Sequence, residues 1–380
     1  MRIAGLIAEF NPFHNGHKYI LDEIKKNFDA VIVIMSGNFV QRGDIAITDK
    51  HTRAAMSLRN GADLIIELPV IYALNTAQKF AYGAVEILNK TGVTNALAFG
   101  SEVGNIGELI NAAGFLENES TEISAKIKKL NSSGMSYPSA RAEAYRGLIN
   151  DCLLSKPNNI LAVEYIRALM HIESNIKPYT IKRTNDFHSK EAEGNIISAT
   201  AARQLIADGK NASDFLPEPE FDVYSLRALD TVITYHLRMV TPEYLSEIND
   251  VSEGLENRII FAARNNFGFE EICAAIKSKR YTMSRIRRVV LSSFLGLTKD
   301  LCGSAPSYIR VLGMNERGRE ILKAMKKKSE LPVIVKTADF KPDKIFNAEI
   351  RASEAAALCR KKGVLKAGRE YTVSPVIIKN

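Results

Sequence analysis

Two histidines separated by two residues are the side chains of this sequence best placed to do chemistry. The segment His14 to His17 (His-Asn-Gly-His) follows a short apolar run, Ile3 to Ala8, that has the pattern of a strand buried on both faces. Pro12 interrupts this run, and the stretch 18–26 behind the histidines has the amphipathic pattern of a helix. Both histidines therefore stand where a strand end turns into a helix start.

A helix start of this kind favours a bound anion such as phosphate, because its backbone N–H groups are unpaired and the helix dipole is positive there. Gly16 permits a close backbone approach, and the imidazoles of His14 and His17 can both reach the bound group. The alternative is a pair of surface histidines on a helix start, but this alternative does not explain the strand–turn–helix context.

The H-x-G-H pattern formed by His14, Gly16 and His17 resembles the signature of the nucleotidyltransferase superfamily, which includes the class I tRNA synthetases. In that superfamily the histidines stabilise charge while a nucleophile attacks the α-phosphate of ATP and pyrophosphate leaves. The resemblance implies catalytic roles for His14 and His17.

Strands and helices alternate along the first half of the chain. Apolar, β-rich runs at 30–35, 62–68 and 95–100 are separated by helical patterns near 50–59 and 76–89. The alternation predicts an α/β fold with a Rossmann-like parallel sheet, in which ligands bind beyond the carboxyl ends of the strands. That rule places several polar segments at one edge of the sheet: His14, His17, the loop 36–44, Glu67, Gly100–Glu102 and Arg183.

Further polar residues are candidates for contacts with phosphate. Arg42 or Lys50 could hold triphosphate oxygens, Arg through a planar fork of donors and Lys as a point charge. Ser198 and Thr200 stand at the start of a predicted helix that carries Arg203 one turn in, and they fit either a phosphate site or ordinary helix capping. Together with the two histidines, they resemble the I-S-x-T-x-x-R element of nucleotidyltransferases.

Several further stretches resemble the bacterial tRNA(Met) cytidine acetate ligases in order and spacing, and together they cover nearly the whole chain. They are Gly5–His17, Met35–Gly43, Phe99–Glu102, Lys156–Leu161, Ile197–Thr200, Glu253–Ile259 and Tyr281–Arg287. The resemblance implies an enzyme that joins acetate and ATP into acetyl-adenylate, with Mg²⁺ on the pyrophosphate. The acetyl group then passes to N4 of the wobble cytidine in the anticodon loop of elongator tRNA(Met).

The resemblance also implies a set of ATP-binding residues and no metal held by protein ligands. The ATP-binding residues are Leu6, Ile7, Ala8, Glu9, Phe10, Asn11, Pro12, Phe13, His14, Asn15, Gly16, His17, Lys18, Tyr19, Gly100, Asn158 and Arg183. Neither the resemblance nor the residue pattern names a group that takes the proton from the cytosine amine, or one that selects acetate.

The second half of the chain reads as mainly helical and basic. We expect an ATP-binding catalytic domain at 1–212, a linker at 213–222 with two prolines and several acids, and a helical domain at 223–380. Within the helical part, residues 308–380 have a mixed pattern that includes a β-rich run at 371–378. Six basic residues crowd into twelve positions and predict a tRNA-binding face, with a solvated helix face as the alternative: Lys277, Lys279, Arg280, Arg285, Arg287 and Arg288.

Composition limits the remaining possibilities. No stretch approaches the ~20 apolar residues of a membrane span, and four widely separated cysteines suggest reduced thiols in a cytoplasmic protein. A net charge of +8 points weakly to an anionic partner. Two other classes stay open: a small-molecule adenylyltransferase of the pantetheine or nicotinamide-nucleotide type, and a non-catalytic RNA-binding protein with a nucleotide fold. The first is usually much shorter, and the second does not explain two phosphate motifs.

Overall fold

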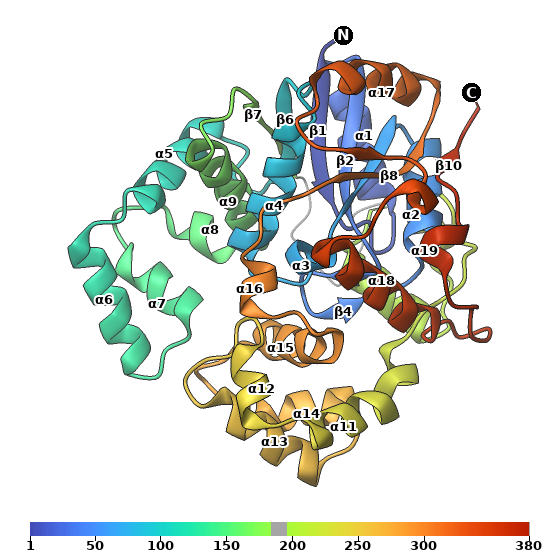
Figure 1. The fold of residues 1–380 in the computed structure, drawn as a ribbon. Coiled ribbons are helices and arrows are strands. Elements are labelled where there is room, and N and C mark those ends of the chain that lie inside the picture. The colour runs from blue at the N-terminus through green and yellow to red at the C-terminus, as the bar shows by residue number, and fades with distance from the viewer. Residues whose placement is uncertain (184–195, 380) are drawn as a thin grey trace.

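The computed structural model describes residues 1–183 and 196–379, and its centre is a mainly parallel sheet (Figure 1). The strands follow the order β10-β8-β5-β2-β1-β6-β7, with β9 beside β8. Their bounds are β1 Ile3–Ala8, β2 Ala30–Ser36, β5 Leu64–Leu68, β6 Ala96–Ser101, β7 Lys177–Lys182, β8 Ile309–Met314, β9 Val333–Ile334 and β10 Val376–Ile377. A separate hairpin joins β3 (Phe39–Val40) to β4 (Asp44–Ile45). The predicted parallel α/β sheet is confirmed.

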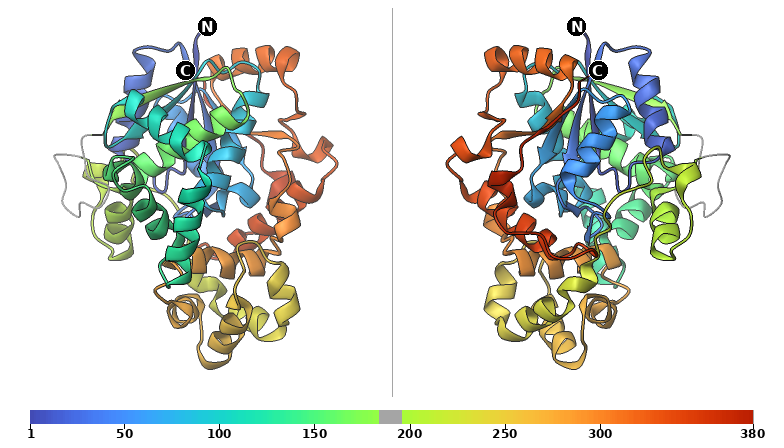
Figure 2. Two further views of the ribbon diagram at one scale, coloured as in Figure 1. Left: turned by 90° about the vertical axis from the view of Figure 1, so that its left-hand side faces the viewer. Right: turned by 90° about the vertical axis from the view of Figure 1, so that its right-hand side faces the viewer.

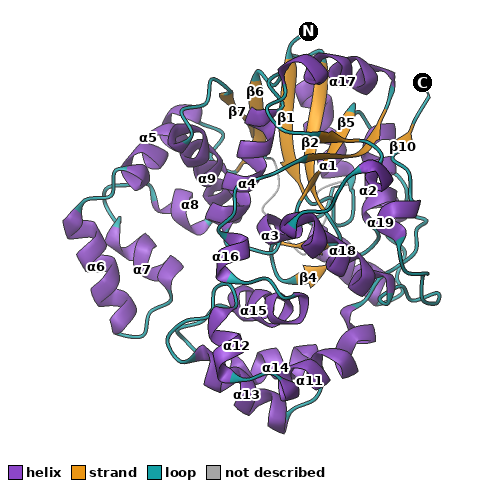
Figure 3. Cartoon of the chain, in the orientation of Figure 1, coloured by secondary structure: helices purple, strands orange, loops and turns teal. Residues whose placement is uncertain are grey.

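Helices enclose the sheet on both faces (Figure 3). The helices of the first half are α1 Asn15–Lys25, α2 Lys50–Arg59, α3 Val70–Ala73, α4 Ala77–Lys90, α5 Ile106–Glu117, α6 Thr121–Ser132, α7 Tyr137–Ala144, α8 Asp151–Ser155, α9 Pro157–His171 and α10 Ala199–Ala207. Side chains of β2 alternate between two apolar cores: Ile32 and Ile34 belong to one, Val31 and Val33 to the other. A strand covered on both faces has to be apolar throughout, which is why the central strands read as continuous apolar runs.

The topology places a crevice at the end of β1. From β1 the chain crosses to β2 on one side, and the later strand β6 pairs with β1 on the other. Loops leaving β1 and β6 therefore diverge, and such a switch point is where ligands bind in open α/β sheets. Helix α1 begins at Asn15, with His14 as its N-cap. This arrangement brings the two-histidine segment to the crevice.

The second half of the chain forms a helical region and then returns to the sheet. Its helices are α11 Asp230–Met239, α12 Pro242–Glu247, α13 Leu255–Asn265, α14 Phe269–Ile276, α15 Met283–Leu295, α16 Lys299–Cys302, α17 Glu316–Lys328, α18 Lys344–Ala357 and α19 Arg369–Thr372. Single-turn 3-10 helices occur at Ser213–Phe215, Leu226–Leu229 and Thr337–Asp339. Figure 2 shows α11–α15 as a group at the opposite end of the molecule from the two chain ends. Among the described residues, no helix is both long enough and apolar enough to cross a bilayer.

Residues 223–379 are mainly helical, as expected, but they do not stand apart from the first half. Strand β8 pairs antiparallel with β5, and β9 and β10 pair with β8. Strand β10 falls within the β-rich run predicted at 371–378, and its pairing was not predictable because it depends on residues some 60 positions earlier. Both halves of the chain thus contribute strands to one sheet, and the domain boundary at 213–222 stays a prediction.

Candidate functional site

A cleft of about 700 Å³ lies beyond the carboxyl ends of β1 and β6. Its walls come from the ends of these strands, the start of α1, and residues of α4, α9 and α10. The loop 40–44 and the beginning of α15 complete it on the side of the helical region. The cleft therefore brings residues from both halves of the chain to the predicted ligand-binding edge of the sheet.

Most of the residues implied as ATP-binding line this cleft. They are Leu6, Ile7, Ala8, Glu9, Phe10, Asn11, His14, His17, Gly100, Asn158 and Arg183, joined by the four candidate phosphate contacts Arg42, Ser198, Thr200 and Arg203. The other implied residues of the first segment are placed beside it, outside the lining: Pro12, Phe13, Asn15, Gly16, Lys18 and Tyr19. The ATP contacts of these six residues remain predictions.

The two histidines stack on each other inside the cleft. Their ring centroids are 3.7 Å apart, and Phe10 and Phe13 pack against His17 at 5.0 and 5.7 Å. The backbone N–H of His14 donates to Nδ1 of His17 at 3.3 Å, so in the neutral ring of His17 the proton resides on Nε2. Nδ1 of His14 is buried without a hydrogen-bond partner in the described structure. A buried polar atom of this kind is normally satisfied, and a bound anion here would do so.

Burial lowers the pKa of both histidines. The pKa of His14 falls to about 3, because burial and then the nearby Arg183 and Arg203 disfavour the imidazolium. The pKa of His17 falls well below its usual value through burial, His14 and Arg183. At neutral pH both rings are therefore uncharged and can act on a phosphate as N–H donors.

This shift makes the stability of the protein depend on pH. Between the unfolded pKa of His14, about 6.5, and its folded pKa, about 3, the unfolded chain binds the extra proton, so stability falls as pH falls. At pH 5 the loss of folding stability caused by His14 amounts to about 2 kcal/mol relative to neutral pH, from 1.36 kcal/mol per pKa unit. We expect urea titrations at pH 7.5 and 5 to show a smaller loss of stability in His14→Asn than in the unsubstituted protein. Equal losses in both would contradict a neutral, buried His14.

Four arginines and two carboxylates are among the described residues that line the cleft, which gives it a surplus of positive charge. Nη1 of Arg203 donates to the carbonyl of Asn11 at 2.6 Å, and its Nη2 donates to the hydroxyl of Thr200 at 3.1 Å. Burial lowers the pKa of Arg42, Arg183 and Arg203 despite neighbouring carboxylates. Buried guanidinium groups in excess over carboxylates fit the oxygens of a triphosphate.

Arg183 and Asn158 meet on the β6 side of the cleft. Arg183 runs so closely past Gly100 that a Cβ there would lie 3.0 Å from its side chain, so this position requires glycine or a displaced arginine. Nη1 of Arg183 is 3.5 Å from Oδ1 of Asn158, whose amide donates to Glu102 at 2.7 Å. Glu102 also accepts the backbone N–H groups of Asn158 and Asn159, so it caps α9 and fixes Asn158.

Ser198 caps a helix, as one of its two predictions had it, and its contact with phosphate stays a prediction. It is the N-cap of α10, and its hydroxyl accepts the N–H of Ala201 at 3.1 Å. The same residue lines the cleft with Thr200. The start of α10 therefore faces the cleft, where its free N–H groups favour an anion.

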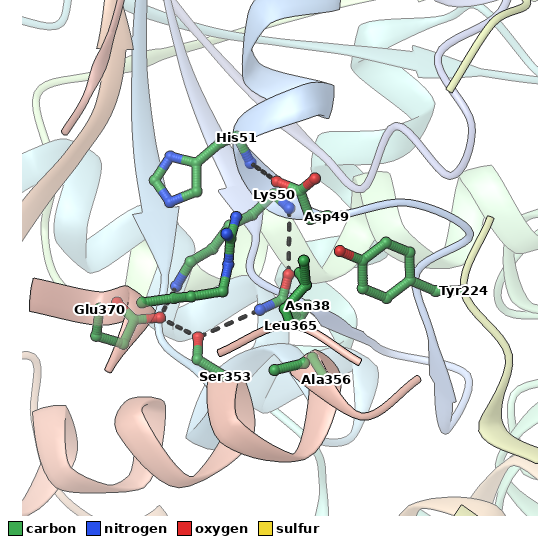
Figure 4. A pocket seen from close by; sticks show the side chains of 11 residues that line it. Asn38, Asp49, Lys50, His51, Tyr224, Ser353, Ala356, Leu365 and Glu370 are labelled. Atoms are coloured by element: carbon green, nitrogen blue, oxygen red, sulfur yellow. Dashed lines mark hydrogen bonds and ion pairs between the residues drawn. The ribbon is translucent and has the colours of Figure 1, made fainter. Parts of the chain in front are cut away.

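Lys50 does not lie in the cleft, which corrects its prediction as a phosphate contact. Its ammonium group is buried and lies 2.6 Å from Glu67, within a cluster that also includes Glu349, Glu370 and Arg310. Figure 4 shows Lys50 beside Glu370. Glu67, expected at the ligand edge, is fully buried in the same cluster. Lys50 follows the N-cap Asp49 of α2, and the helix directs it under the sheet edge toward α18 and α19. Its sequence neighbours gave no sign of these acids, two of which lie about 300 residues away.

The six basic residues predicted as a tRNA-binding face do not form one continuous exposed surface. Lys277 and Lys279 are exposed, whereas Arg288 is buried. Arg285 and Arg288 pair with Asp250, and Arg280 pairs with Glu253. These ion pairs neutralise three of the arginines that the sequence pattern predicted to bind RNA.

Arg287 has a different position from the rest of this group. It lines the cleft, lies 3.1 Å from Asp44, and donates to the carbonyl of Gly43 at 2.9 Å. A Cβ at Gly43, where φ is +78°, would lie 2.6 Å from the side chain of Arg287. The backbone of the loop 40–44 therefore contacts the side chain of Arg287 on α15. This contact connects the helical region to the cleft.

Sequence reasoning missed several apolar residues of the cleft. Phe80, Phe99, Ile160, Leu161 and Tyr165 line it from α4, β6 and α9. Their spacing on amphipathic helices indicates only a buried face, which serves a core and a ligand site equally well. No sequence signal distinguishes the two uses.

The parallel sheet, the stacked histidines at the start of α1 and the arginine-lined cleft together define a nucleotidyltransferase. Consistent with this, the model of the family "HIGH Nucleotidyl Transferase" matches residues 1–370. Two proteins named tRNA(Met) cytidine acetate ligase are similar over their full length. The one from a Thermoanaerobacter species is 39% identical, with 99% of this chain and 100% of that protein covered; the one from Acetivibrio thermocellus is 38% identical, with 100% of both covered.

The solved structures include a match of the same kind. The crystal structure of Thermotoga maritima TmcAL bound with alpha-thio ATP superposes with a TM-score of 0.90 at 32% identity, over 100% of both chains. This chain therefore belongs to the tRNA(Met) cytidine acetate ligases, within the HIGH nucleotidyl transferase family.

Proposed function

We propose that this chain is an ATP-dependent ligase that activates acetate as acetyl-adenylate and transfers the acetyl group to a cytidine of tRNA(Met). The observation that carries the proposal is the stacked pair His14 and His17, with an unpartnered buried Nδ1, at the start of a helix in a cleft lined by four arginines. Membership of the family supplies the acyl group and the RNA, and its solved member binds an ATP analogue.

In the first step a carboxylate oxygen of acetate attacks the α-phosphorus, and the bond to pyrophosphate breaks. The reaction adds negative charge to the phosphoryl oxygens at the transition state, so donors aimed at them provide most of the acceleration. We assign that role to Nε2–H of His17 and the guanidinium of Arg203, and neutral imidazoles avoid repulsion from Arg183. Mg²⁺ is proposed on the pyrophosphate; among the described residues, no group of three His, Cys, Asp or Glu side chains could hold a metal ion alone.

In the second step the exocyclic amine (N4) of the wobble cytidine of elongator tRNA(Met) attacks the acetyl carbon, and AMP leaves. A wobble base belongs to a single-stranded loop, so it can leave its stack at small cost and enter the cleft. On the side of the helical region the cleft is bordered by α15 and the loop 40–44, and we propose that the anticodon loop approaches along this side.

One assay separates the proposal from its alternatives. Pyrophosphate release from ATP is measured with and without acetate and with and without elongator tRNA(Met), followed by mass analysis of the tRNA nucleosides. We expect release that requires acetate and a nucleoside heavier by one acetyl group. Turnover on a dinucleotide precursor without acetate indicates a small-molecule adenylyltransferase, and no turnover with any acid indicates a non-catalytic RNA-binding protein.

The exposed lysines give the RNA proposal its own test. Lys277 and Lys279 lie exposed between α14 and α15, and each lost phosphate contact lowers the salt dependence of binding by about one unit of slope. We expect Lys277→Ala with Lys279→Ala to weaken tRNA binding and to reduce the slope of log affinity against log salt by about two. The measurement is filter binding from 50 to 300 mM salt. An unchanged slope removes both lysines from the RNA face; the matched pair Lys326→Ala with Lys327→Ala on α17 is the control.

A further inference from the structure

Arg42 stands in the loop 40–44, at the tip of the hairpin that joins β3 to β4, and it lines the cleft. Neither strand of this hairpin belongs to the central sheet. A two-stranded hairpin is at best marginally stable by itself, so contacts from elsewhere have to hold its tip. These contacts decide where Arg42 stands in the cleft.

Two neighbouring arginines of α15 hold the loop on both sides of Arg42. The carbonyl of Gln41, directly before Arg42, accepts Nη1 of Arg288 at 3.4 Å. The carbonyl of Gly43, directly after Arg42, accepts Nε of Arg287 at 2.9 Å. The backbone is therefore anchored to α15 on either side of Arg42.

Every nitrogen of the Arg287 guanidinium has an oxygen of the protein as its partner. Nε binds the carbonyl of the loop, Nη2 lies 3.1 Å from Asp44, and Nη1 donates to Glu270 on α14 at 2.6 Å. The guanidinium carbon lies 4.7 Å from the centre of the Phe269 ring, which is a cation–π contact. Only 15% of the Arg287 side chain is exposed. Arg287 is thus better placed to hold the loop than to bind a ligand itself.

The helical region fixes both arginines from the side opposite the loop. Glu270 orients Arg287, and Asp250, which precedes α13, lies 3.3 Å from Nη2 of the buried Arg288. Two acids from separate segments therefore direct neighbouring side chains of one helix toward the same loop. The helical region, and not the sheet, sets the position of this part of the cleft wall.

Gly43 permits the close approach of the loop to α15. Its φ is +78°, and a Cβ there would lie 2.6 Å from the Cβ of Arg287 and 2.7 Å from the backbone nitrogen of Arg288. Both distances are too short for a real Cβ atom, and the backbone of α15 cannot rotate out of the way as a flexible side chain can. A side chain at residue 43 would therefore push the loop away from α15.

We infer that Arg287 is a positioning residue for nucleotide binding, which holds the loop 40–44 so that Arg42 reaches the phosphates of ATP. The inference rests on the proposed function, because ATP is the ligand proposed for the cleft. A guanidinium donates to phosphate oxygens through a rigid fork, so the strength of its contact depends on where its backbone is held. When the loop leaves α15, Arg42 loses this alignment.

A double-substitution experiment tests whether Arg287 acts through Arg42. Binding of ATP with Mg²⁺, without acetate, is measured by isothermal titration calorimetry in Arg42→Ala, Arg287→Met and the double variant. We expect Arg42→Ala to weaken ATP binding about 10–100-fold, the usual contribution of a hydrogen bond to a charged group, and Arg287→Met about tenfold. The double variant should bind ATP within about twofold of Arg42→Ala, because residues that act through one another do not add.

A second substitution moves the loop without changing any charge. Gly43→Ala should weaken ATP binding about as much as Arg287→Met, and it keeps the test independent of how well Arg287→Met folds. Arg264→Met removes an exposed arginine from α13, away from the loop, and is the control that should retain full ATP affinity.

Steady-state kinetics of acetate-dependent pyrophosphate release provides a further readout. In Arg287→Met the KM for ATP should rise about tenfold while kcat changes by less than about threefold, because a contact made equally in the ground and transition states affects KM alone. A variant that is only partly folded would instead show a lower kcat at an unchanged KM.

Two results would overturn the inference. Full ATP affinity in both Arg287→Met and Gly43→Ala shows that the loop needs no hold from α15. Losses that multiply in the double variant show that Arg287 affects ATP independently of Arg42. A failure of the proposed function gives a different result, because then the unsubstituted enzyme binds ATP but releases no pyrophosphate when acetate is added.

Discussion

Replacing His17 by alanine is expected to slow acetate-dependent pyrophosphate release from ATP by about 10²–10³-fold, the usual cost of losing one donor to a developing oxyanion. The proton of its neutral ring resides on Nε2, because Nδ1 accepts the His14 N–H at 3.3 Å. Alanine removes that donor and also the stacking partner of His14. Because tRNA binding is proposed to depend on other surfaces, the affinity for elongator tRNA(Met) should stay within about twofold. Steady-state kinetics and filter binding measure the two quantities.

The surface histidine His171 offers a matched control for this substitution. It lies at the end of α9 with 64% of its side chain exposed and contacts Glu117. We expect His171→Ala to retain full adenylation. A large loss of tRNA affinity in His17→Ala would contradict the division of labour between the histidines and the helical region. Normal pyrophosphate release in that variant would contradict its assignment as a phosphate donor.

The second large effect is expected from Arg310→Met, which should lower the free energy of unfolding by about 3–5 kcal/mol. Arg310 is buried on β8, lies 2.9 Å from Glu67, and also pairs with Glu370. Burial raises the pKa of Glu349 to about 8, so at neutral pH two cations face two carboxylates in this cluster. Met is similar in volume, but it leaves the carboxylates of Glu67 and Glu370 with Lys50 as their one remaining cation. Removing one member of a buried pair is costly because the other keeps its desolvation penalty.

Equilibrium unfolding in urea tests this prediction, with Arg317→Met as the control because Arg317 is exposed on α17. A loss below 1 kcal/mol in Arg310→Met would show that the cluster does not hold the strands of the second half to the sheet. Activity per folded molecule should change little in Arg310→Met, since Arg310 lies outside the cleft lining. A raised KM for ATP at full folding would place the cluster in nucleotide binding after all.

The sequence by itself determined the parallel sheet and the place on it of the proposed catalytic histidines. The two-histidine segment, the alternating strands and helices, and the Ser198–Arg203 helix start all depend on spacing within a few residues. Local spacing is decided by backbone geometry, so it can be read without the fold. For this reason the predicted residues at the end of β1, at Gly100, at Asn158 and at Arg183 do meet in one cleft.

Only the tertiary structure decided which charges face the ligand and which face each other. Lys50 and Arg42 look alike as candidate phosphate contacts in the sequence, yet Lys50 is buried among three glutamates and Arg42 lines the cleft. The partners of Lys50 come from residues 67, 349 and 370, and β8 joins the sheet through a pairing that spans some 240 residues. Contacts over such distances depend on how the elements pack. The same is true of Glu9, whose carboxylate is positioned by Gln41 and not by its neighbours in the chain.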